Sequence, residues 1–430
     1  MTDEVTSSTK RIISPTIWYL LIALAASGIA WWWSFSLFTT LHHGIFWSGA
    51  IFAWIHLAVL GSLLTGAFGV MFQLIPIAFQ APPLSKKVAV WHLPLHLLSI
   101  TLMVYGFARM QFYFVGTGGS LLLINVFLYL LQVYKSYKQA RNKTIVHRRL
   151  WLPILGLMLV MCIGIWQAFS LPGTGLSLLL SHIMLGTLWF WGGLVLVISY
   201  KFIPMFVLSH GYYANLKLSS GLYFTGTALF AVSVYWPSAT SPLPALLGTV
   251  FTIGGLIIFS LDILRILRAR KRKRIVFPLQ ITIIATFTLI VSIALLFAAV
   301  LVHSIRLGIE AGYLFYFAGM VPLLTGYAQK IIPFLYYEYR YSHAIDRKNA
   351  PLIDEMVPSA PIRTAMALYA VNVVAGFVYF IAFKEFSPST QHLISLVLSL
   401  LGSLAFIVVL ISLIYVLCIG GKRPVELPEK

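Results

Sequence analysis

Long apolar runs joined by short polar segments dominate the pattern of this chain. Most runs hold about 20 to 30 residues, enough for an α-helix to cross a hydrocarbon core of about 30 Å. Because lipid offers no hydrogen-bond partner to the backbone, such runs are expected to be helical. The pattern predicts twelve spans, at 15–38, 46–80, 88–109, 112–134, 149–170, 176–206, 219–237, 243–268, 277–303, 310–336, 362–383 and 393–419. We therefore expect an all-α, polytopic membrane protein.

The composition excludes a soluble globular protein. Of the 430 residues, 60% are hydrophobic and 10% are charged, whereas about a quarter of a globular chain is charged. The two cysteines, Cys162 and Cys418, lie in different predicted spans, so we expect no structural disulfide. No CxxC or Cys/His zinc pattern occurs. The polar N-terminus lacks a small-residue cleavage site before the first apolar run, so no removable signal peptide is expected.

The basic residues are distributed unequally between the two sides of the predicted membrane. The net charge is +19, and if the N-terminus is inside, 27 of the 30 Lys and Arg are inside. Arg109, Arg306 and Lys384 are the three outside. This asymmetry predicts a multi-pass protein of a prokaryotic cytoplasmic membrane with both termini cytoplasmic. Basic residues beside membrane helices are expected to meet anionic lipid headgroups, so the bilayer is the expected partner and nucleic acid is not.

A short motif recurs at a fixed interval. Gln73-Leu-Ile-Pro76, Lys201-Phe-Ile-Pro204 and Lys330-Ile-Ile-Pro333 place their prolines 128 and 129 residues apart, with four spans per interval. Alternatively, the motif only marks the end of a long helix, because proline disfavours helix in the residue before it. The spacing predicts a single membrane domain over 1–430, with internal repeats at approximately 15–134, 149–268 and 277–419. We expect three four-helix arcs with pseudo-threefold symmetry.

Two histidines lie well inside predicted spans. His56 and His182 precede their repeat prolines by 20 and 22 residues, so they should lie at similar depth, near the outer edge of the hydrocarbon. An ionisable residue at such depth is a functional hypothesis by default, and imidazole is a common ligand of haem iron and copper. The alternative is a neutral histidine bonded to a neighbouring helix.

The other histidines are weaker candidates for metal binding. His92 and His96 share a helix face at the inner mouth of the third span, where we expect an interfacial pair touching loops or headgroups. His42 and His43 lie in a predicted outer loop, and His303 lies beside Arg306 and Glu310. We expect a structural ion pair between Arg306 and Glu310, although this Arg could also pair with a haem propionate.

Acidic residues are scarce in the spans. None lies in the middle of a predicted span, and Asp262, near the inner end of the eighth, is expected to pair with Arg265. Proton-coupled proteins usually carry a membrane-embedded carboxylate, so a proton-coupled mechanism is disfavoured.

The segment from His56 to Pro76 resembles the second helix of haem-copper oxidase catalytic subunits. It is most similar to the nitric oxide reductase branch, where a His is followed about twenty residues later by a Gly-rich, aromatic segment that ends in [LI]-[IV]-P. The resemblance implies that His56 is an axial ligand of a low-spin haem. Twelve spans in three quartets also fit that family, as does an inside location of both termini.

The chain departs from that family at other positions. The tenth span contains none of the family's haem-binding histidines, and Tyr313 occupies the repeat position of His56. The seventh span, from Ser219, lacks the copper histidines, so His182 is the only residue that resembles a copper ligand. These absences argue against a proton-pumping terminal oxidase. A looser resemblance to NnrS-like haem- and copper-containing proteins lacks their WHAHE-type motif.

The expected function is that of a haem-copper oxidase subunit I-like membrane protein. His56 would bind one b-type haem, with His182 as second ligand or in a separate, copper-containing site. Electron transfer, or interaction with NO or O2, would follow, with a redox partner or small accessory membrane subunit. An enzyme of this kind would be an oxidoreductase related to haem-copper oxidases and nitric oxide reductases. The alternatives are a twelve-span transporter of a metal or small molecule and a cofactor-free respiratory-complex subunit.

Overall fold

Helices make up nearly all of the regular structure in the computed structural model of this protein. It describes residues 14–42, 45, 47–82, 84–140, 143–170, 175–235, 243–271, 273–341 and 351–419. Within these ranges there is no strand, only an isolated bridge between Ser209 and Arg270. Eleven described helical stretches are long and apolar enough to cross a membrane. The prediction of an all-α, polytopic membrane protein is confirmed.

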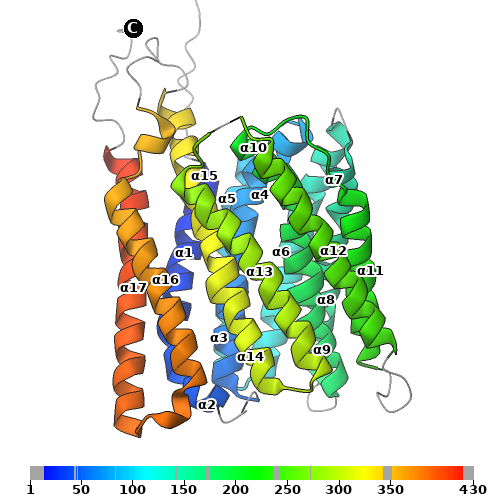
Figure 1. Cartoon of the computed structure of the whole chain (residues 1–430), viewed down its shortest axis with the longest axis vertical. Coiled ribbons are helices and arrows are strands. Elements are labelled where there is room, and N and C mark those ends of the chain that lie inside the picture. Colours follow the sequence, from blue (N-terminus) through cyan, green and yellow to red (C-terminus); the bar gives the residue numbers. More distant parts are fainter. Residues whose placement is uncertain are drawn as a thin grey trace, which may run out of the picture.

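The α-helices lie side by side with their axes roughly along one direction (Figure 1). Their bounds are α1 Pro15–Ser34, α2 Phe38–His42, α3 Gly49–His56, α4 Thr65–Phe79, α5 Lys86–Ala108, α6 Phe112–Gln139, α7 Ile145–Arg149, α8 Trp151–Ser170, α9 Leu176–Met184, α10 Gly193–Val207, α11 Leu216–Ser233, α12 Leu243–Arg268, α13 Phe277–Leu301, α14 Ile305–Tyr313, α15 Val321–Tyr341, α16 Ser359–Ile381 and α17 Pro388–Ile419. Short 3-10 turns occur at Phe35–Leu37, Ile353–Glu355 and Phe383–Glu385. The helix predicted at 219–237 is α11, which packs along α12 but is not one of the eleven.

Three of the stretches change their helical winding part of the way along. A π-helical segment joins α3 to α4 at Leu57–Leu64, another joins α9 to α10 at Leu185–Gly192, and a third joins α14 to α15 at Leu314–Met320. Each begins 19 residues before its repeat proline, since 76 − 57, 204 − 185 and 333 − 314 all equal 19. π-Helical segments are rare and occur frequently at functional sites. The recurrence in the sequence is thus matched by a recurrence in backbone geometry.

The three interrupted helices lie at the centre of the bundle. They and α1 have 61–67% of their most apolar windows buried, against 28–44% for the other seven stretches. Gly66 and Gly69 of α4 lie in this interior. A side chain at Gly66 would collide with Leu324 of α15, and one at Gly69 would collide with Tyr19 of α1. Close helix contact through small residues is typical of packing in lipid.

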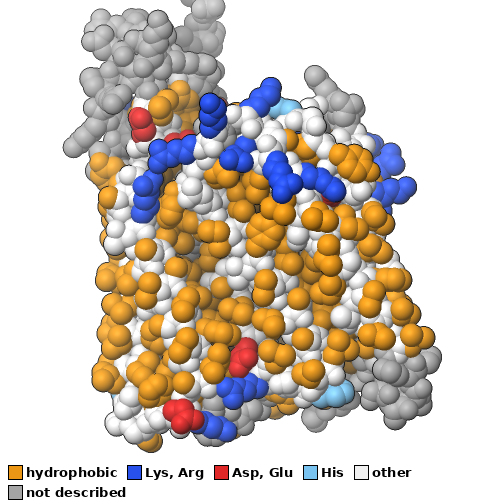
Figure 2. Space-filling model, viewed as in Figure 1, with side chains coloured by type: hydrophobic (Ala, Val, Ile, Leu, Met, Phe, Trp, Pro, Cys, Tyr) orange, Lys and Arg blue, Asp and Glu red, His pale blue; other side chains and the backbone are white. Residues whose placement is uncertain are grey.

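Most of the visible Lys and Arg side chains gather at one end of the bundle. Figure 2 shows most of the visible Lys and Arg in a band at that end, and an orange, apolar surface over much of the length below it. We call it the basic end; α10 and α15 finish there (Figure 1). A wide apolar belt facing outward is the surface expected of a protein whose solvent is lipid.

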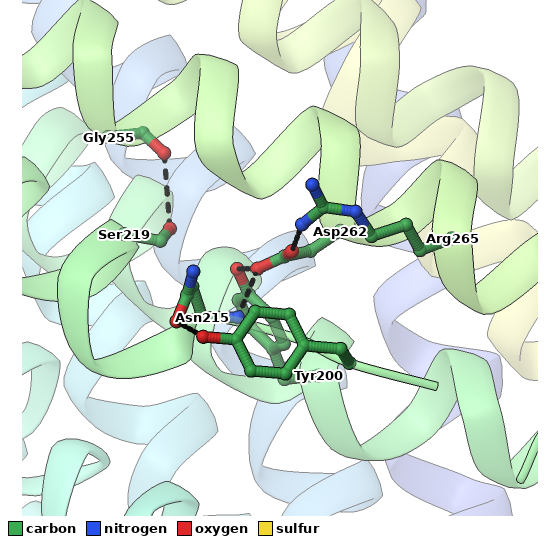
Figure 3. A network of polar contacts seen from close by, with 7 residues as sticks. Tyr200, Asn215, Ser219, Gly255, Asp262 and Arg265 are labelled. Carbon is green, nitrogen blue, oxygen red and sulfur yellow. Dashed lines mark hydrogen bonds and ion pairs between the residues drawn. The ribbon is translucent and has the colours of Figure 1, made fainter. Parts of the chain in front are cut away.

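A buried carboxylate joins three helices near the basic end. Asp262 of α12 is fully buried and accepts hydrogen bonds from Tyr200 Oη of α10 at 2.8 Å and from the backbone N–H of Asn215 at 2.7 Å. Arg265 pairs with it at 2.8 Å (Figure 3), so that expected pairing is confirmed. Beside this network, Ser219 Oγ donates to the carbonyl of Gly255. Because these three partners satisfy the carboxylate, Asp262 has a structural role.

Candidate functional site

His56 is the last residue of α3, immediately before the first π-helical segment. Its Nδ1 lies 2.7 Å from the carbonyl oxygen of Phe52, one turn earlier in the helix. A carbonyl can only accept, so Nδ1 carries the hydrogen and Nε2 keeps its lone pair. Histidines that bind metals commonly donate their other ring N–H to a carbonyl or carboxylate in this way. The local geometry therefore prepares Nε2 of His56 as a ligand.

His182 lies in α9, near the start of the second π-helical segment. Its ring rests against Gly164 of α8, where a Cβ would lie only 2.8 Å from His182 Cε1. Glycine is required for this close approach. The Nδ1 atom of His182 is buried and has no hydrogen-bond partner in the described part of the chain. Since a buried polar atom without a partner is costly, this imidazole needs an explanation.

The two imidazoles lie next to each other. Their ring centres are 6.4 Å apart, and the ring planes are inclined by 32°. With metal–nitrogen bonds of about 2 Å, two imidazoles on opposite sides of one ion have ring centres about 6 Å apart. Phe107 of α5 stacks on the face of His56, at 4.3 Å and 30°, which leaves the Nε2 edge of that ring uncovered by this contact. The pair is thus spaced for a shared ion.

The donor set is compatible with haem iron. It offers two imidazoles on different helices, one with its tautomer fixed by a backbone carbonyl and the other with a buried atom that lacks a partner. Arg109 follows Phe107 by two residues at the end of α5 and is solvent-exposed. Neither of the two described pockets is lined by His56 or His182, so a macrocycle would require the surrounding side chains to move.

Of the weaker candidates, the structure describes the side chain of His303. His303 is exposed and has a positive φ of 52° in the turn after α13. The expected ion pair between Arg306 and Glu310 forms at 3.1 Å, and Arg306 also donates to the carbonyl of Ile381. His42 is the last residue of α2, but its side chain, like all of His43, lies outside the described part.

In the third interrupted helix, the repeat position of His56 is occupied by a tightly packed tyrosine. Tyr313 immediately precedes the third π-helical segment, as His56 precedes the first, and its hydroxyl donates to the carbonyl of Val373 at 3.0 Å. Its ring packs against Phe38 and Phe317, and the hydroxyl would touch a Cβ at Gly376. Aromatic packing fills this region, and the hydroxyl's hydrogen is already used.

The prediction that His92 and His96 touch loops or headgroups is wrong. Their exposed fractions are 3% and 0%, because α5 begins at Lys86 and places both residues on a face covered by its neighbours. His92 Nδ1 contacts Tyr19 Oη and His96 Nε2 contacts Thr65 Oγ1, both at 2.8 Å. The regular i, i+4 spacing in an apolar run was the available signal, but the partners come from other helices.

An apolar cavity of about 80 Å³ lies between the three interrupted helices. It lies between the π-helical segments and the basic end. Residues at equivalent repeat positions line it, such as Leu63, Trp191 and Met320, which are separated by 128 and 129 residues. The same register relates Val70, Ile198 and Tyr327, with further lining by Gly66, Leu194, Leu323, Ala67, Val195 and Leu324. Each of the three helices therefore presents a similar face to one shared space.

In comparisons with known proteins, no family model matches the chain, and no curated protein matches it.

Proposed function

We propose that this protein is a haem-copper oxidase subunit I-like membrane haem protein, in which His56 and His182 bind one b-type haem. The observation that carries the proposal is the spacing of the two rings, 6.4 Å between centres, with Nδ1 of His56 anchored to Phe52. When bound, such a haem supplies a one-electron redox centre. A copper ion on the same pair is the alternative occupant, since copper also favours imidazole.

The surroundings of the pair favour electron transfer. If both imidazoles held the iron, NO or O2 would bind only after His182 moved away. Phe52 holds the His56 ring through its carbonyl, and Phe107 covers one face of that ring. An apolar shell with few hydrogen bonds to the ligands raises the cost of adding charge and so tunes the redox potential.

The proposal includes no proton pumping. In the described part of the chain Asp262 is the buried acidic residue, and Tyr200, Asn215 and Arg265 satisfy it. It therefore offers no free embedded carboxylate for proton transfer. A redox partner or small accessory membrane subunit would deliver or receive the electron.

The proposed architecture has twelve spans in three four-helix arcs related by a pseudo-threefold axis. It is supported by the equal distances between the π-helical segments and the prolines, and by the cavity lining at equivalent positions. It counts α11 as the twelfth span, because this helix packs along α12. The gathering of Lys and Arg at one end (Figure 2) supports the proposed orientation, with the basic end and both termini cytoplasmic in a prokaryotic cytoplasmic membrane.

The first test is an absorption spectrum of the detergent-purified protein, oxidised and dithionite-reduced, with a pyridine haemochrome and metal analysis. We expect a Soret band and sharp reduced α and β bands, which His56→Ala removes. His303→Ala is the matched control and should leave the spectrum unchanged, because that residue is exposed and distant in sequence from the pair. Absence of a Soret band after expression with ample haem would refute the haem assignment.

The second candidate function is transport of a small apolar molecule, and the cavity between the interrupted helices favours it. Transporters bind substrates where helices are interrupted, and the cavity is almost entirely apolar. Val195→Phe should fill this space. If the Val195→Phe variant loses uptake of the small molecule while its haem spectrum is unchanged, transport is supported. If the unsubstituted protein binds no haem and shows no uptake, the remaining function is that of a cofactor-free respiratory-complex subunit.

A further inference from the structure

A second histidine pair is enclosed by α1, α4, α5 and α6, apart from the pair proposed to hold haem. His92 and His96 follow one another by one turn of α5, with ring centres 5.9 Å apart and planes inclined by 20°. The ring of Phe68 packs against both, at 4.7 and 5.3 Å. This cluster lies buried inside the bundle, so each polar atom in it needs a partner.

The hydrogen bonds of His96 fix its tautomer. Thr65 Oγ1 donates its single hydrogen to the carbonyl of Leu60 at 3.0 Å. Both contacts of Thr65 Oγ1 are hydrogen bonds only when His96 Nε2–H is the donor in the 2.8 Å contact between them, and we assign this tautomer. The other nitrogen, Nδ1, then carries a bare lone pair, and it is buried without a partner.

The same reasoning applies to His92. Tyr19 Oη has one hydrogen and two contacts, with the carbonyl of Ala89 at 3.1 Å and with His92 Nδ1 at 2.8 Å. Both are hydrogen bonds when Tyr19 donates to the carbonyl and Nδ1–H of His92 donates to Tyr19 Oη, and we assign this tautomer. His92 Nε2 is then a second bare lone pair, also buried and without a partner. Both histidines thus use one nitrogen to anchor the ring and keep the other available.

Two residues of α6 add further unpartnered oxygen atoms. Asn125 Nδ2 donates to the backbone carbonyl of His92, which leaves Oδ1 without a donor. Tyr129 Oη is likewise buried and unpartnered, and the Tyr129 ring packs against those of His92 and Phe68. Unsatisfied buried polar atoms are uncommon in native proteins, and four of them occur in this one cluster. The cluster therefore offers these four atoms to a guest that brings positive charge or polar hydrogens.

We propose that His92 Nε2 and His96 Nδ1 hold one copper(I) ion. Imidazole suits zinc, copper, iron and nickel, but structural zinc requires four ligands, and the described residues contain no group of three or more His, Cys, Asp or Glu. No carboxylate or thiolate contacts the cluster in the described part of the chain, so a divalent ion would keep an unbalanced charge in an apolar interior. Copper(I) has a single charge and accepts two nitrogen ligands.

The aromatic shell agrees with that oxidation state. The rings of Phe68, Phe72 and Tyr129 all contact the ring of His92. A shell that excludes water and offers no anionic ligand favours the ion of lower charge. Asn125 Oδ1 and Tyr129 Oη would lie beside the ion as neutral oxygen atoms. A trapped water molecule that bridges these atoms is the competing occupant.

The test uses full-length protein with the double substitution His56→Leu and His182→Leu, so that copper on the other pair cannot contribute. The purified protein is loaded with copper(I) under ascorbate and washed with a copper(I) chelator. We expect one copper per chain, with an X-ray absorption spectrum typical of copper(I) bound by two nitrogen atoms. Adding His92→Leu or His96→Leu should lower the retained copper at least tenfold, whereas adding His210→Leu, at an exposed site, should not.

Folding of each variant is checked by a monodisperse elution profile. If the leucine variants fail this check, His92→Gln and His96→Gln replace them. A second measurement is silver(I), which shares the two-nitrogen coordination and should raise the Tm of the double variant but not of its His96→Gln derivative. Absence of retained copper in a folded protein, or copper that persists without His92 and His96, would overturn the proposal and leave water in the cluster. The result is independent of the haem assignment, because the background lacks both proposed haem ligands.

Discussion

His182 and Gly164 are in direct contact: a Cβ added at Gly164 would lie 2.8 Å from Cε1 of the imidazole. This contact fixes the depth of the ring between α8 and α9 and holds it 6.4 Å from His56. A single hydrogen atom in place of a side chain therefore decides where the second proposed ligand lies.

Gly164→Ala should displace His182 and leave His56 in place. We expect the absorption spectrum of the reduced protein and the EPR spectrum of the oxidised protein to change from those of a six-coordinate, low-spin haem to those of a five-coordinate, high-spin one. Gly175→Ala is the matched control, because nothing lies within 4 Å of that position. A low-spin spectrum that survives Gly164→Ala would exclude His182 as the second ligand.

Removing one residue from the first π-helical segment should separate the pair. Deletion of Leu60 would favour α-helical winding and rotate α3 relative to α4 by about 100°, which carries His56 away from His182. The haem content should then fall at least tenfold, as measured by pyridine haemochrome. Deletion of Ala318 in the third segment changes the winding of a helix that carries neither proposed ligand, and we expect it to retain the haem.

Asp262→Asn should destabilise the end of the bundle where α10, α11 and α12 meet. The amide would turn one N–H group toward donors that now face a carboxylate, so we expect a loss of about 1–3 kcal/mol in the free energy of unfolding. Thermal unfolding in detergent measures it as a lower Tm. Arg306→Gln, which breaks a more exposed ion pair, should cost about 1 kcal/mol or less. Equal effects of the two substitutions would contradict the structural role of Asp262.

Cysteine labelling tests the proposed orientation. In a background with Cys162→Ser and Cys418→Ser, a membrane-impermeant maleimide added to intact cells should label Lys384→Cys but not Lys143→Cys. Both positions are exposed in the structure, so access to each depends on its side of the membrane. Permeabilised cells should show labelling at both sites, which controls for reactivity. Labelling of Lys143→Cys alone in intact cells would reverse the topology.

Several features could be predicted because they depend on local sequence. Apolar runs of membrane length predicted the helices, and i, i+3 or i, i+4 spacing predicted the ion pairs Asp262–Arg265 and Arg306–Glu310. The Ile-Pro motifs recur at the same interval as the three π-helical segments. Each of these follows from the period or the length of a single helix.

The sequence by itself therefore determined the helical class, the apolar exterior and the proline register, because lipid requires every span to satisfy its own backbone hydrogen bonds. Only the tertiary structure decided which histidines meet. His56 and His182 lie in different interrupted helices, and His92 and His96 are buried because α1, α4 and α6 cover their face of α5. Side chains from separate helices become neighbours through packing, in which glycines such as Gly164 set the distance of approach. That packing depends on all the helices of the bundle together, so it cannot be predicted from the periodic pattern along one helix.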